Sequence, residues 1–486
     1  MTSSISNRSP HSKPRASRIA RGGIAPWLIA SVILAALSLV HSSMPTGFDP
    51  SAWVTWANSA AHGEFILFRI EPGWKPLPVI AMTPAAMLSE HLAGALWLVT
   101  VRACALLTPV LVFRLIKPTF GGWAAGIAAA GVASIPGLWV TALGGHSEPA
   151  AVAAALGAAE CLRRERPRAA IILIATFALM RPEAILLLGI VATYAAVNRK
   201  WSWVALVAGC AAMFAACWYG LPWLLADDPW QVHRLSPITP PFRNAFSPLE
   251  KLTMPLSAGL WPLHLAGIGL AGLGTIGVAR SRDRLLKGVV AAAIGFAIIE
   301  VAVLLSGAAG APRYFLPATI LGSSLIGPGA MLLIGRLRSA SARNAAAIAA
   351  MFVLVATGPL PPGSPLRNRA LVIPSADDAR NLDRAASLLI SSRVLERPAA
   401  CGPIGVSYGT WPMIASRTGQ PMSRFDYTVR APVVTLEHID AAGKRNPDQM
   451  HMIGDPGDRR VLAASEDPTG GGRWIVASWG AAKPCG

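Results

Sequence analysis

The stretch PAAVAAALGAAECLRRERPRAAIILIATFALMRPEAILLLGIVATYAAVNRK, residues 149–200, decides the fold. Its apolar runs, 149–162, 169–181 and 184–197, alternate with the basic clusters Arg163–Arg168 and Arg199–Lys200. Short basic clusters between apolar runs are typical of the cytoplasmic loops of membrane proteins. The charged break Arg181-Pro182-Glu183, between the last two runs, belongs at the outer surface or in a hydrated cavity. This stretch therefore predicts helices that cross a membrane in pairs.

The composition of the whole chain agrees with this. Hydrophobic residues make up 53% of the 486 residues, charged residues only 14%, and the mean hydropathy is +0.48. A soluble domain carries about 25% charged residues. The net charge of +18 lies mainly in short clusters between apolar runs, which indicates membrane topology and argues against nucleic acid as a partner.

Two further basic clusters, Arg280–Lys287 and Arg336–Arg343, extend the pattern. The fold class we predict is a polytopic α-helical membrane protein with about eleven transmembrane helices in residues 24–358. A basic cytoplasmic tail, 1–23, precedes them, and the outer loops are 43–76, 221–255 and 307–314. The run 77–90 is short for a span of about 20 residues, so we expect a juxtamembrane or re-entrant helix there.

Residues 359–486 are polar and contain no apolar run of membrane length. We expect a soluble extracytoplasmic α/β or α+β domain, with short strands at Gly402–Val406 and Trp474–Trp479 and a helix at Ala376–Val394. Cys401 and Cys485 would form a disulfide in an oxidising compartment or remain two thiols.

Ionisable residues on the outer face of the membrane are the default functional candidates, because they are costly to place there. Asp49, in GFDPSAW, is a candidate general base, or else it caps a helix that begins near Ser51. Lys75, in FRIEPGWKPLP with Arg69, is suited to a lipid phosphate or to an interfacial Trp-Lys anchor.

Three more groups qualify on the same face. Glu148, in His146-Ser147-Glu148, is either functional or complements a helix dipole. For Arg181 and Glu183 we favour a structural ion pair that satisfies a broken helix. The pair Arg313-Tyr314 fits a phosphate or an interfacial belt. The loop 221–255, with His233 and Arg243, is long enough for a binding lid.

In order along residues 24–335, these motifs resemble the GT-C superfamily of membrane glycosyltransferases, which use polyprenyl-phosphate-linked sugars as donors. The motifs are the acidic residue in GFDPSAW, the Lys-Pro in GWKPLPV, and the later LGGHSEP, LMRPEAILLL and PRYFLPA. Many members of the superfamily also end in an extracytoplasmic domain. The chain departs from the pattern at Asp49, which has Phe48 and Pro50 as neighbours where several members carry adjacent acidic residues.

The resemblance implies an inverting transfer to a hydroxyl of a glycan, lipid or protein on the outer face of the plasma (inner) membrane. Asp49 would be the general base, and Glu148 would position the acceptor. Lys75, Arg313 and Arg69 would bind the donor phosphate, and the substrate-binding residues would be His146, Tyr314, Arg181, Glu183, His233 and Arg243. No cofactor is implied, a divalent metal has no paired-carboxylate site to support it, and mannose and arabinofuranose are both candidate donor sugars.

Three other classes of function remain open at this stage. A transporter or lipid flippase would need charges along a path across the bilayer, and the run 288–306 contains only Glu300. A glycan ligase or polymerase of another fold would use arginines of a long outer loop, such as Arg234 and Arg243. A membrane scaffold would only present the C-terminal domain.

Overall fold

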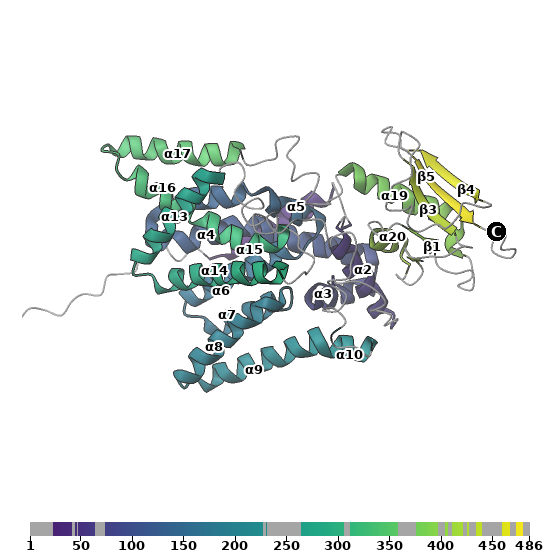
Figure 1. The fold of residues 1–486 in the computed structure, drawn as a ribbon, viewed down its shortest axis with the longest axis horizontal. Helices are drawn as coiled ribbons and strands as arrows, with labels where there is room; N and C mark the ends of the chain where they lie inside the picture. The colour runs from purple at the N-terminus through teal and green to yellow at the C-terminus, as the bar shows by residue number, and fades with distance from the viewer. Residues whose placement is uncertain are drawn as a thin grey trace, which may run out of the picture.

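The computed structural model describes most of the chain. The described residues are 23–40, 44–45, 47–63, 73–226, 230, 264–305, 312–357, 376–396, 404–406, 411–420, 425–426, 434–439, 459–466 and 473–479. An elongated bundle of helices occupies one end of the molecule and a small β-sheet domain the other (Figure 1).

The first half of the bundle runs to residue 226. Its elements are α1 (Ala25–Leu37), η2 (Ser38–Val40), α2 (Phe48–Ala61), α3 (Pro76–Ala86), α4 (Glu90–Ala133), α5 (Pro136–Gly144), α6 (Glu148–Arg163), α7 (Pro167–Ala178), η3 (Pro182–Ala184), α8 (Ile185–Val197), α9 (Trp201–Ala215), η4 (Ala216–Gly220) and α10 (Leu221–Ala226). The second half comprises α13 (His264–Arg280), α14 (Arg284–Leu305), η6 (Pro312–Phe315), α15 (Leu316–Ser324), α16 (Ile326–Ile334) and α17 (Ala340–Thr357).

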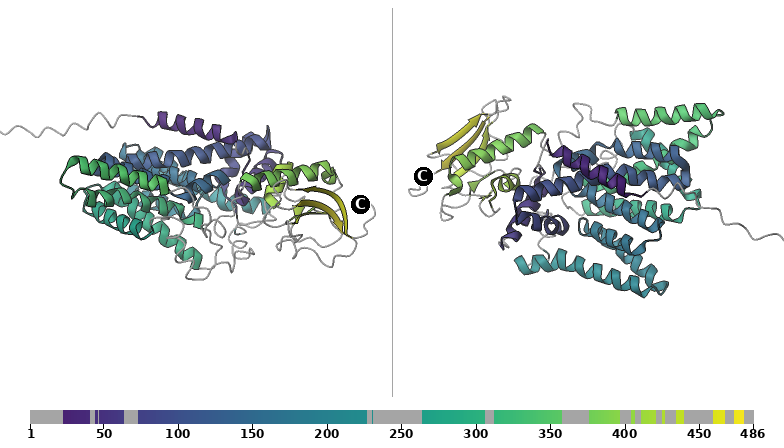
Figure 2. Two further views of the ribbon diagram at one scale, coloured as in Figure 1. Left: turned by 90° about the horizontal axis from the view of Figure 1, so that it is seen from above. Right: turned by 180° about the vertical axis from the view of Figure 1, so that it is seen from behind.

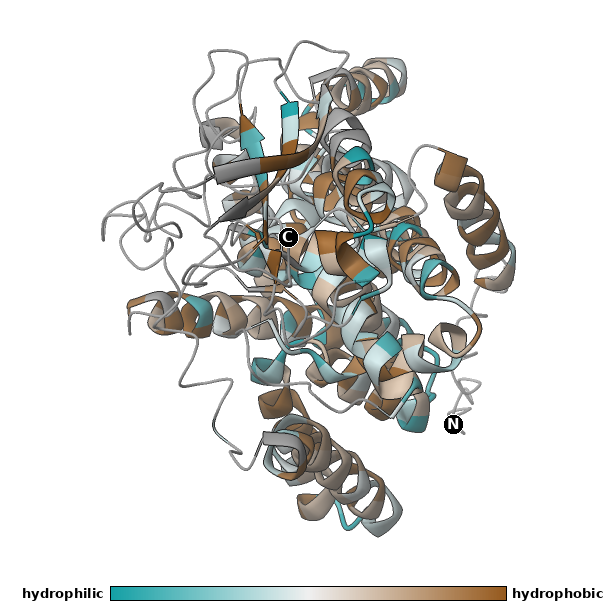
Figure 3. Cartoon of the chain, turned by 90° about the vertical axis from the view of Figure 1, so that its right-hand side faces the viewer, coloured by the Kyte–Doolittle hydropathy of each residue, from teal (hydrophilic) through white to brown (hydrophobic). Residues whose placement is uncertain are grey.

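The bundle is built for a membrane. Among the described residues, four helical stretches are long and apolar enough to cross it: Glu90–Ala133, Trp201–Leu224, Arg284–Val303 and Arg313–Ile334. Large apolar side chains point outward, and Trp27 and Ile33 on α1 are each 54% exposed. Figure 3 shows apolar residues along helices throughout the bundle. The chain is therefore membrane-embedded; the predicted number of eleven crossings stays a prediction.

Helix α4 folds back on itself at Gly121, whose φ of 85° lies in the left-handed region that glycine favours. After this kink the chain runs back toward the end of the bundle at which α4 begins. A contact shows this: the indole Nε1 of Trp97 donates to the carbonyl of Gly145 at 2.7 Å. The apolar run predicted as one helix, 122–143, is in fact two, since α4 ends at Ala133 and α5 starts at Pro136. Proline is favoured in the first turn of a helix.

The end of the bundle away from the β-sheet domain holds predicted cytoplasmic clusters. Arg163 binds Asp283 at 2.9 Å and donates to the carbonyl of Leu115 at 3.2 Å, and Thr119 donates to the same Asp283 carboxylate at 2.5 Å. The basic segments 163–168 and 280–287 therefore lie together. This contact supports the prediction that they share one side of the membrane.

Two short helices, α2 and α3, lie between the bundle and the β-sheet domain (Figures 1 and 2). With 11 residues, α3 is too short to span a bilayer, in line with the juxtamembrane prediction for 77–90. The predicted outer loop 43–76 is not all loop, because it contains α2. The loop 221–255 likewise starts later than predicted, because residues 221–226 continue the preceding helix as α10.

The C-terminal domain contains α19 (Ala376–Ser391), η7 (Val394–Glu396), α20 (Trp411–Thr418) and the strands β1 (Ile404–Gly405), β2 (Phe425–Asp426), β3 (Val434–Ile439), β4 (Arg459–Glu466) and β5 (Arg473–Trp479). The strand order is β2-β1-β3-β5-β4, with β1 parallel to β2 and β3 and the remaining pairs antiparallel. The described part of this region thus contains both helices and strands, and its extracytoplasmic location stays a prediction. Cys401 and Cys485 lie outside the described residues.

The domain docks on the bundle through α20. Arg417 is 8% exposed; it donates to the carbonyl of Pro45 at 3.4 Å and pairs with Asp383 at 2.6 Å. Pro45 closely precedes α2, so the domain rests beside the segment that carries Asp49.

Candidate active site

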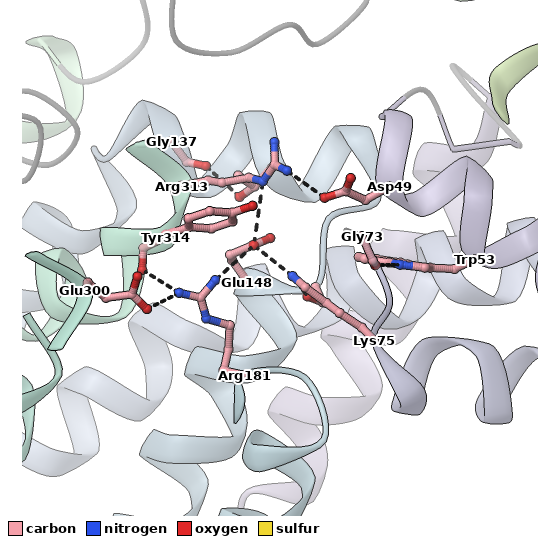
Figure 4. A network of polar contacts seen from close by, with 12 residues as sticks. Asp49, Trp53, Gly73, Lys75, Gly137, Glu148, Arg181, Glu300, Arg313 and Tyr314 are labelled. Atoms are coloured by element: carbon pink, nitrogen blue, oxygen red, sulfur yellow. Dashed lines mark hydrogen bonds and ion pairs between the residues drawn. The ribbon is translucent and has the colours of Figure 1, made fainter. Parts of the chain in front are cut away.

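Charged side chains from six separate segments meet at the end of the bundle that faces the C-terminal domain (Figure 4). They come from the N-terminus of α2, the residue before α3, the start of α6, the break between α7 and α8, the C-terminal part of α14 and the turn η6. The cations are Lys75, Arg181 and Arg313, and the carboxylates are Asp49, Glu148, Glu183 and Glu300. Near-balance of opposite charges lets this many ions lie together under little exposure.

Asp49 and Arg313 form the outermost pair. The guanidinium Nη2 of Arg313 donates to Oδ2 of Asp49 at 2.6 Å, and the two side chains are 19% and 12% exposed. Helix α2 begins at Phe48 with Gly47 as its N-cap residue, so Asp49 lies within the first turn and makes no cap. The alternative that Asp49 caps a helix near Ser51 is therefore wrong.

Lys75 lies deeper. Its ammonium donates to Oγ of Ser147 at 2.7 Å and to Oε1 of Glu148 at 3.1 Å, and it lies 5.2 Å from the centroid of the Trp53 ring. The residue is only 8% exposed, so Lys75 is not the interfacial anchor that was one of its two interpretations. Lys75 precedes α3, outside the membrane-spanning segments, and burial lowers the pKa of its ammonium while Glu148 opposes that shift.

Glu148 is the centre of the network. It is fully buried, and its Oε1 lies 3.1 Å from Lys75 Nζ, 3.9 Å from Arg181 Nη1 and 3.8 Å from Arg313 Nε. It is also the first residue of α6, where the helix dipole favours a negative charge. The helix-dipole interpretation of Glu148 is therefore confirmed, and its functional role stays a prediction.

Arg181 lies between Glu148 on one side and Glu300 and Tyr314 on the other. It binds the Glu300 carboxylate and donates to the carbonyl of Tyr314 at 3.3 Å, and its guanidinium carbon lies 4.7 Å from the centroid of the Tyr314 ring. The predicted pair with Glu183 is present, with Nε and Oε2 3.6 Å apart. However, Glu300 is the closer partner, so the ion pair is part of the site and not merely a repair of a broken helix.

His146 lies beside Gly47, the N-cap residue of α2. A Cβ atom placed on Gly47 would come within 2.6 Å of His146 Nε2, so only glycine fits there without a shift. The imidazole is 2% exposed, and burial together with the nearby Arg313 lowers the pKa of His146 to about 3. His146 is therefore neutral over the physiological pH range, with one ring nitrogen as a donor and the other as an acceptor.

The structure brings together most of the residues that the sequence predicts for a site. These are Asp49, Lys75, His146, Glu148, Arg181, Glu183, Arg313 and Tyr314. Arg69, His233 and Arg243 lie outside the described residues. In the part of the chain that is described, no group of three or more His, Cys, Asp or Glu side chains is arranged to hold a metal ion.

Two site residues were not predicted as such. Ser147 is fully buried and binds Lys75, and Glu300 is 1% exposed and binds Arg181. The signal for Glu300 was present, because a lone carboxylate inside an apolar run needs a partner at membrane depth. For Ser147, only its place between His146 and Glu148 pointed to the site.

In chemical terms, the site offers a partly exposed carboxylate beside fixed cations. Asp49 can accept a proton, and Lys75 and Arg313 can stabilise an anion. Both cations lie beside Glu148, at 3.1 and 3.8 Å, and Arg181 approaches the same carboxylate oxygen at 3.9 Å. Such an arrangement suits a reaction in which a hydroxyl loses a proton while a phosphate departs.

Comparison with known proteins supports the fold. Among solved structures, the chain is similar to ArnT from Cupriavidus metallidurans bound to undecaprenyl phosphate, with a TM-score of 0.54 and 12% sequence identity. The match covers 93% of this chain and 97% of ArnT. No protein-family model and no curated protein matches the sequence. The chain therefore shares its overall fold with the ArnT structure along nearly its whole length.

Proposed function

We propose that the protein is an inverting glycosyltransferase that moves a sugar from a polyprenyl phosphate to a hydroxyl acceptor at the outer face of the plasma membrane. The observation that carries the proposal is the contact of Asp49 with Arg313 beside Lys75, at one end of a membrane-embedded bundle. The ArnT structure was obtained with undecaprenyl phosphate bound, which supports a lipid phosphate as the partner of this fold.

In the proposed reaction, Asp49 accepts the proton of the acceptor hydroxyl. The hydroxyl oxygen forms a bond to the anomeric carbon as the bond from that carbon to the phosphate oxygen breaks. The electron pair of the broken bond leaves with the lipid phosphate. Charge develops on that phosphate in the transition state, and Lys75 and Arg313 stabilise it.

The contact of Arg313 with Asp49 is compatible with this mechanism. A donor phosphate gives Arg313 a second acceptor, and guanidinium binds phosphate bidentately. As Arg313 turns to the phosphate, the carboxylate of Asp49 becomes available to the hydroxyl. Glu148 keeps Lys75 in place and helps to position the acceptor, and His146 and Tyr314 contact the sugar.

The side of the membrane is also part of the proposal. The positive-inside rule favours a cytoplasmic location for the end with Arg163 and Asp283. The site and the C-terminal domain then lie outside, with the N-terminus in the cytoplasm. A transporter is disfavoured, because the described charges gather at the two ends of the bundle and do not line a path across it.

The test is transfer by the purified protein in detergent or liposomes. Labelled polyprenyl-phosphate mannose and polyprenyl-phosphate arabinofuranose are supplied with cell-envelope glycans, and release of the free lipid phosphate is measured. The wild type is compared with Asp49→Asn, and Asp283→Asn at the opposite end is the matched control. We expect Asp49→Asn to reduce turnover at least about 100-fold. Turnover at the wild-type rate would rule out Asp49 as the base.

A further inference from the structure

Three successive backbone carbonyls at the end of α5 each accept a hydrogen bond from outside the helix, two from side chains of α4 and one from the backbone before α2. The carbonyl of Leu143 accepts from Arg102 Nη2 at 3.4 Å, that of Gly144 from the amide of Gly47 at 3.1 Å, and that of Gly145 from Trp97 Nε1 at 2.7 Å. The last carbonyls of a helix have no partner within the helix. Here side chains of α4 and the backbone before α2 supply those partners.

Arg102 is unusual for its place. It lies within α4, is 5% exposed, and its Nη1 also donates to the carbonyl and the hydroxyl of Ser38 at 3.0 and 2.9 Å. Its guanidinium thus lies between the C-terminal ends of α1 and α5. A cation is stabilised at such ends, since both helix dipoles present negative charge there. A buried arginine in a membrane helix is costly, so a role beyond packing is expected.

The segment 143–148, held in this way, carries Glu148 and is hydrogen-bonded to the segment that carries Asp49. Gly145 adopts a φ of 85°, and the chain then turns into His146 and Glu148. On the other side, Gly47 lies two residues before Asp49. The hydrogen bond between Gly47 and Gly144 therefore sets the distance between the segments that carry the Asp49 and Glu148 carboxylates.

We propose that Arg102 and Trp97 are positioning residues for the transfer reaction, which act by fixing the backbone of residues 143–148 against the Asp49 segment. This inference rests on the proposed function. Neither side chain touches the reacting groups. Arg313 lies on another segment, whereas Lys75 binds Ser147 and Glu148 within this one. Binding of the donor phosphate therefore depends in part on Arg102 and Trp97, and alignment of the base with the acceptor depends on both.

The variants are Arg102→Lys, which keeps the charge but loses the fork that reaches both helix ends, and Trp97→Phe, which keeps an aromatic ring against Trp53 but loses the N–H. We expect each to lower kcat roughly 10-fold, as the loss of one positioning hydrogen bond would, with a smaller change in KM for the donor, because Arg313 lies outside the segment. The double variant should lose less than the product of the two effects, because both act on one segment.

Two matched controls carry the same substitutions elsewhere. Arg114→Lys changes an arginine of the same helix that pairs with Glu160 at 2.8 Å, at the other end of the bundle. Trp139→Phe removes an indole N–H that donates to the carbonyl of Ala133 at 2.6 Å. Both should keep kcat within about two-fold of the wild type. If the controls lose as much turnover as Arg102→Lys and Trp97→Phe, the effect is general destabilisation and the inference is overturned.

A readout without catalysis separates this inference from the proposed function. Amide hydrogen exchange of residues 143–148 and of Gly47 should accelerate in Arg102→Lys and Trp97→Phe, and not in the two controls. Unchanged exchange in that segment would overturn the positioning role even if turnover falls. If the wild type transfers no sugar from any donor, the proposed function fails, and the exchange data alone decide whether the two residues hold the segment.

Discussion

Replacing Asp49 with asparagine should change binding and turnover in opposite directions. Asp49 binds Arg313, with Nη2 and Oδ2 2.6 Å apart, so a donor phosphate that binds Arg313 must compete with that carboxylate. Asparagine keeps the size of the side chain and removes its charge. Arg313 is then free to bind the phosphate, while the base needed for transfer is lost.

The size of the effect follows from the exposure of the pair. The two side chains are 19% and 12% exposed, so the pair is neither a surface salt bridge, worth about 0–1 kcal/mol, nor a fully buried one. We take about 1 kcal/mol for the competition that the substitution removes. Because about 1.4 kcal/mol corresponds to a tenfold change in an equilibrium constant, the affinity for polyprenyl phosphate should rise roughly 5-fold.

The assay is titration of the purified protein with undecaprenyl phosphate in detergent, followed by calorimetry or by quenching of tryptophan fluorescence. Asp283→Asn serves as the control, because it removes one carboxylate from the far end of the bundle and should leave the affinity unchanged. Turnover of Asp49→Asn is measured in parallel. Weaker binding of undecaprenyl phosphate by Asp49→Asn would refute the reasoning, since it would mean that Asp49 supports the phosphate site and does not compete with it.

Three further predictions concern other parts of the site. Because burial lowers the pKa of Lys75, transfer should fall with rising pH below the usual lysine pKa of about 10.4, as the ammonium loses its proton, and Lys75→Arg should move that alkaline limit upward in a pH–rate profile. Glu300→Gln should lower the free energy of unfolding by about 3 kcal/mol, because Arg181 keeps only the more distant Glu183 and Glu148 at 3.6 and 3.9 Å. Thermal unfolding in detergent measures this change. As the control, Glu165→Gln at an exposed position should change the free energy of unfolding by less than about 0.5 kcal/mol. Gly47→Ala should abolish most transfer, because the new Cβ would lie 2.6 Å from His146 Nε2. Gly122→Ala in α4, where a Cβ would have nothing within 4 Å, should leave transfer unchanged. Equal activity of the two variants would contradict a role of the Gly47–His146 contact in the site.

Much of the site was predictable because charge is costly in a membrane. Each of Asp49, Lys75, Glu148, Arg181 and Arg313 interrupts or borders an apolar run, and the basic clusters assign all of them to one side. That argument fixes which end of the bundle a residue occupies. It does not fix which partner the residue meets there.

Apart from the pair of Arg181 with Glu183, the pairings therefore came only from the structure. Arg181 was expected to pair with Glu183, two positions away, yet its closer partner is Glu300, 119 positions along the chain. A local pattern carries no information on such a contact, because it depends on how α7 and α14 pack. The division of the run 122–143 was missed for another reason: Pro136 starts a new helix, and a count of apolar residues takes no account of it.

In the proposed reaction, the cations that speed departure of the phosphate also hold the product. The donor phosphate is a diester with one negative charge, whereas the released lipid phosphate is a monoester with about −1.5 to −2 charges at pH 7. Lys75 and Arg313 should thus bind the product more tightly than the donor, and product release would become slow. The protonated Asp49 cannot compete for Arg313 directly after the transfer, but it can once it has lost its proton to water. In this reaction, the contact of Asp49 with Arg313 would be the interaction that displaces the product, and one carboxylate would both start the reaction and reset the site.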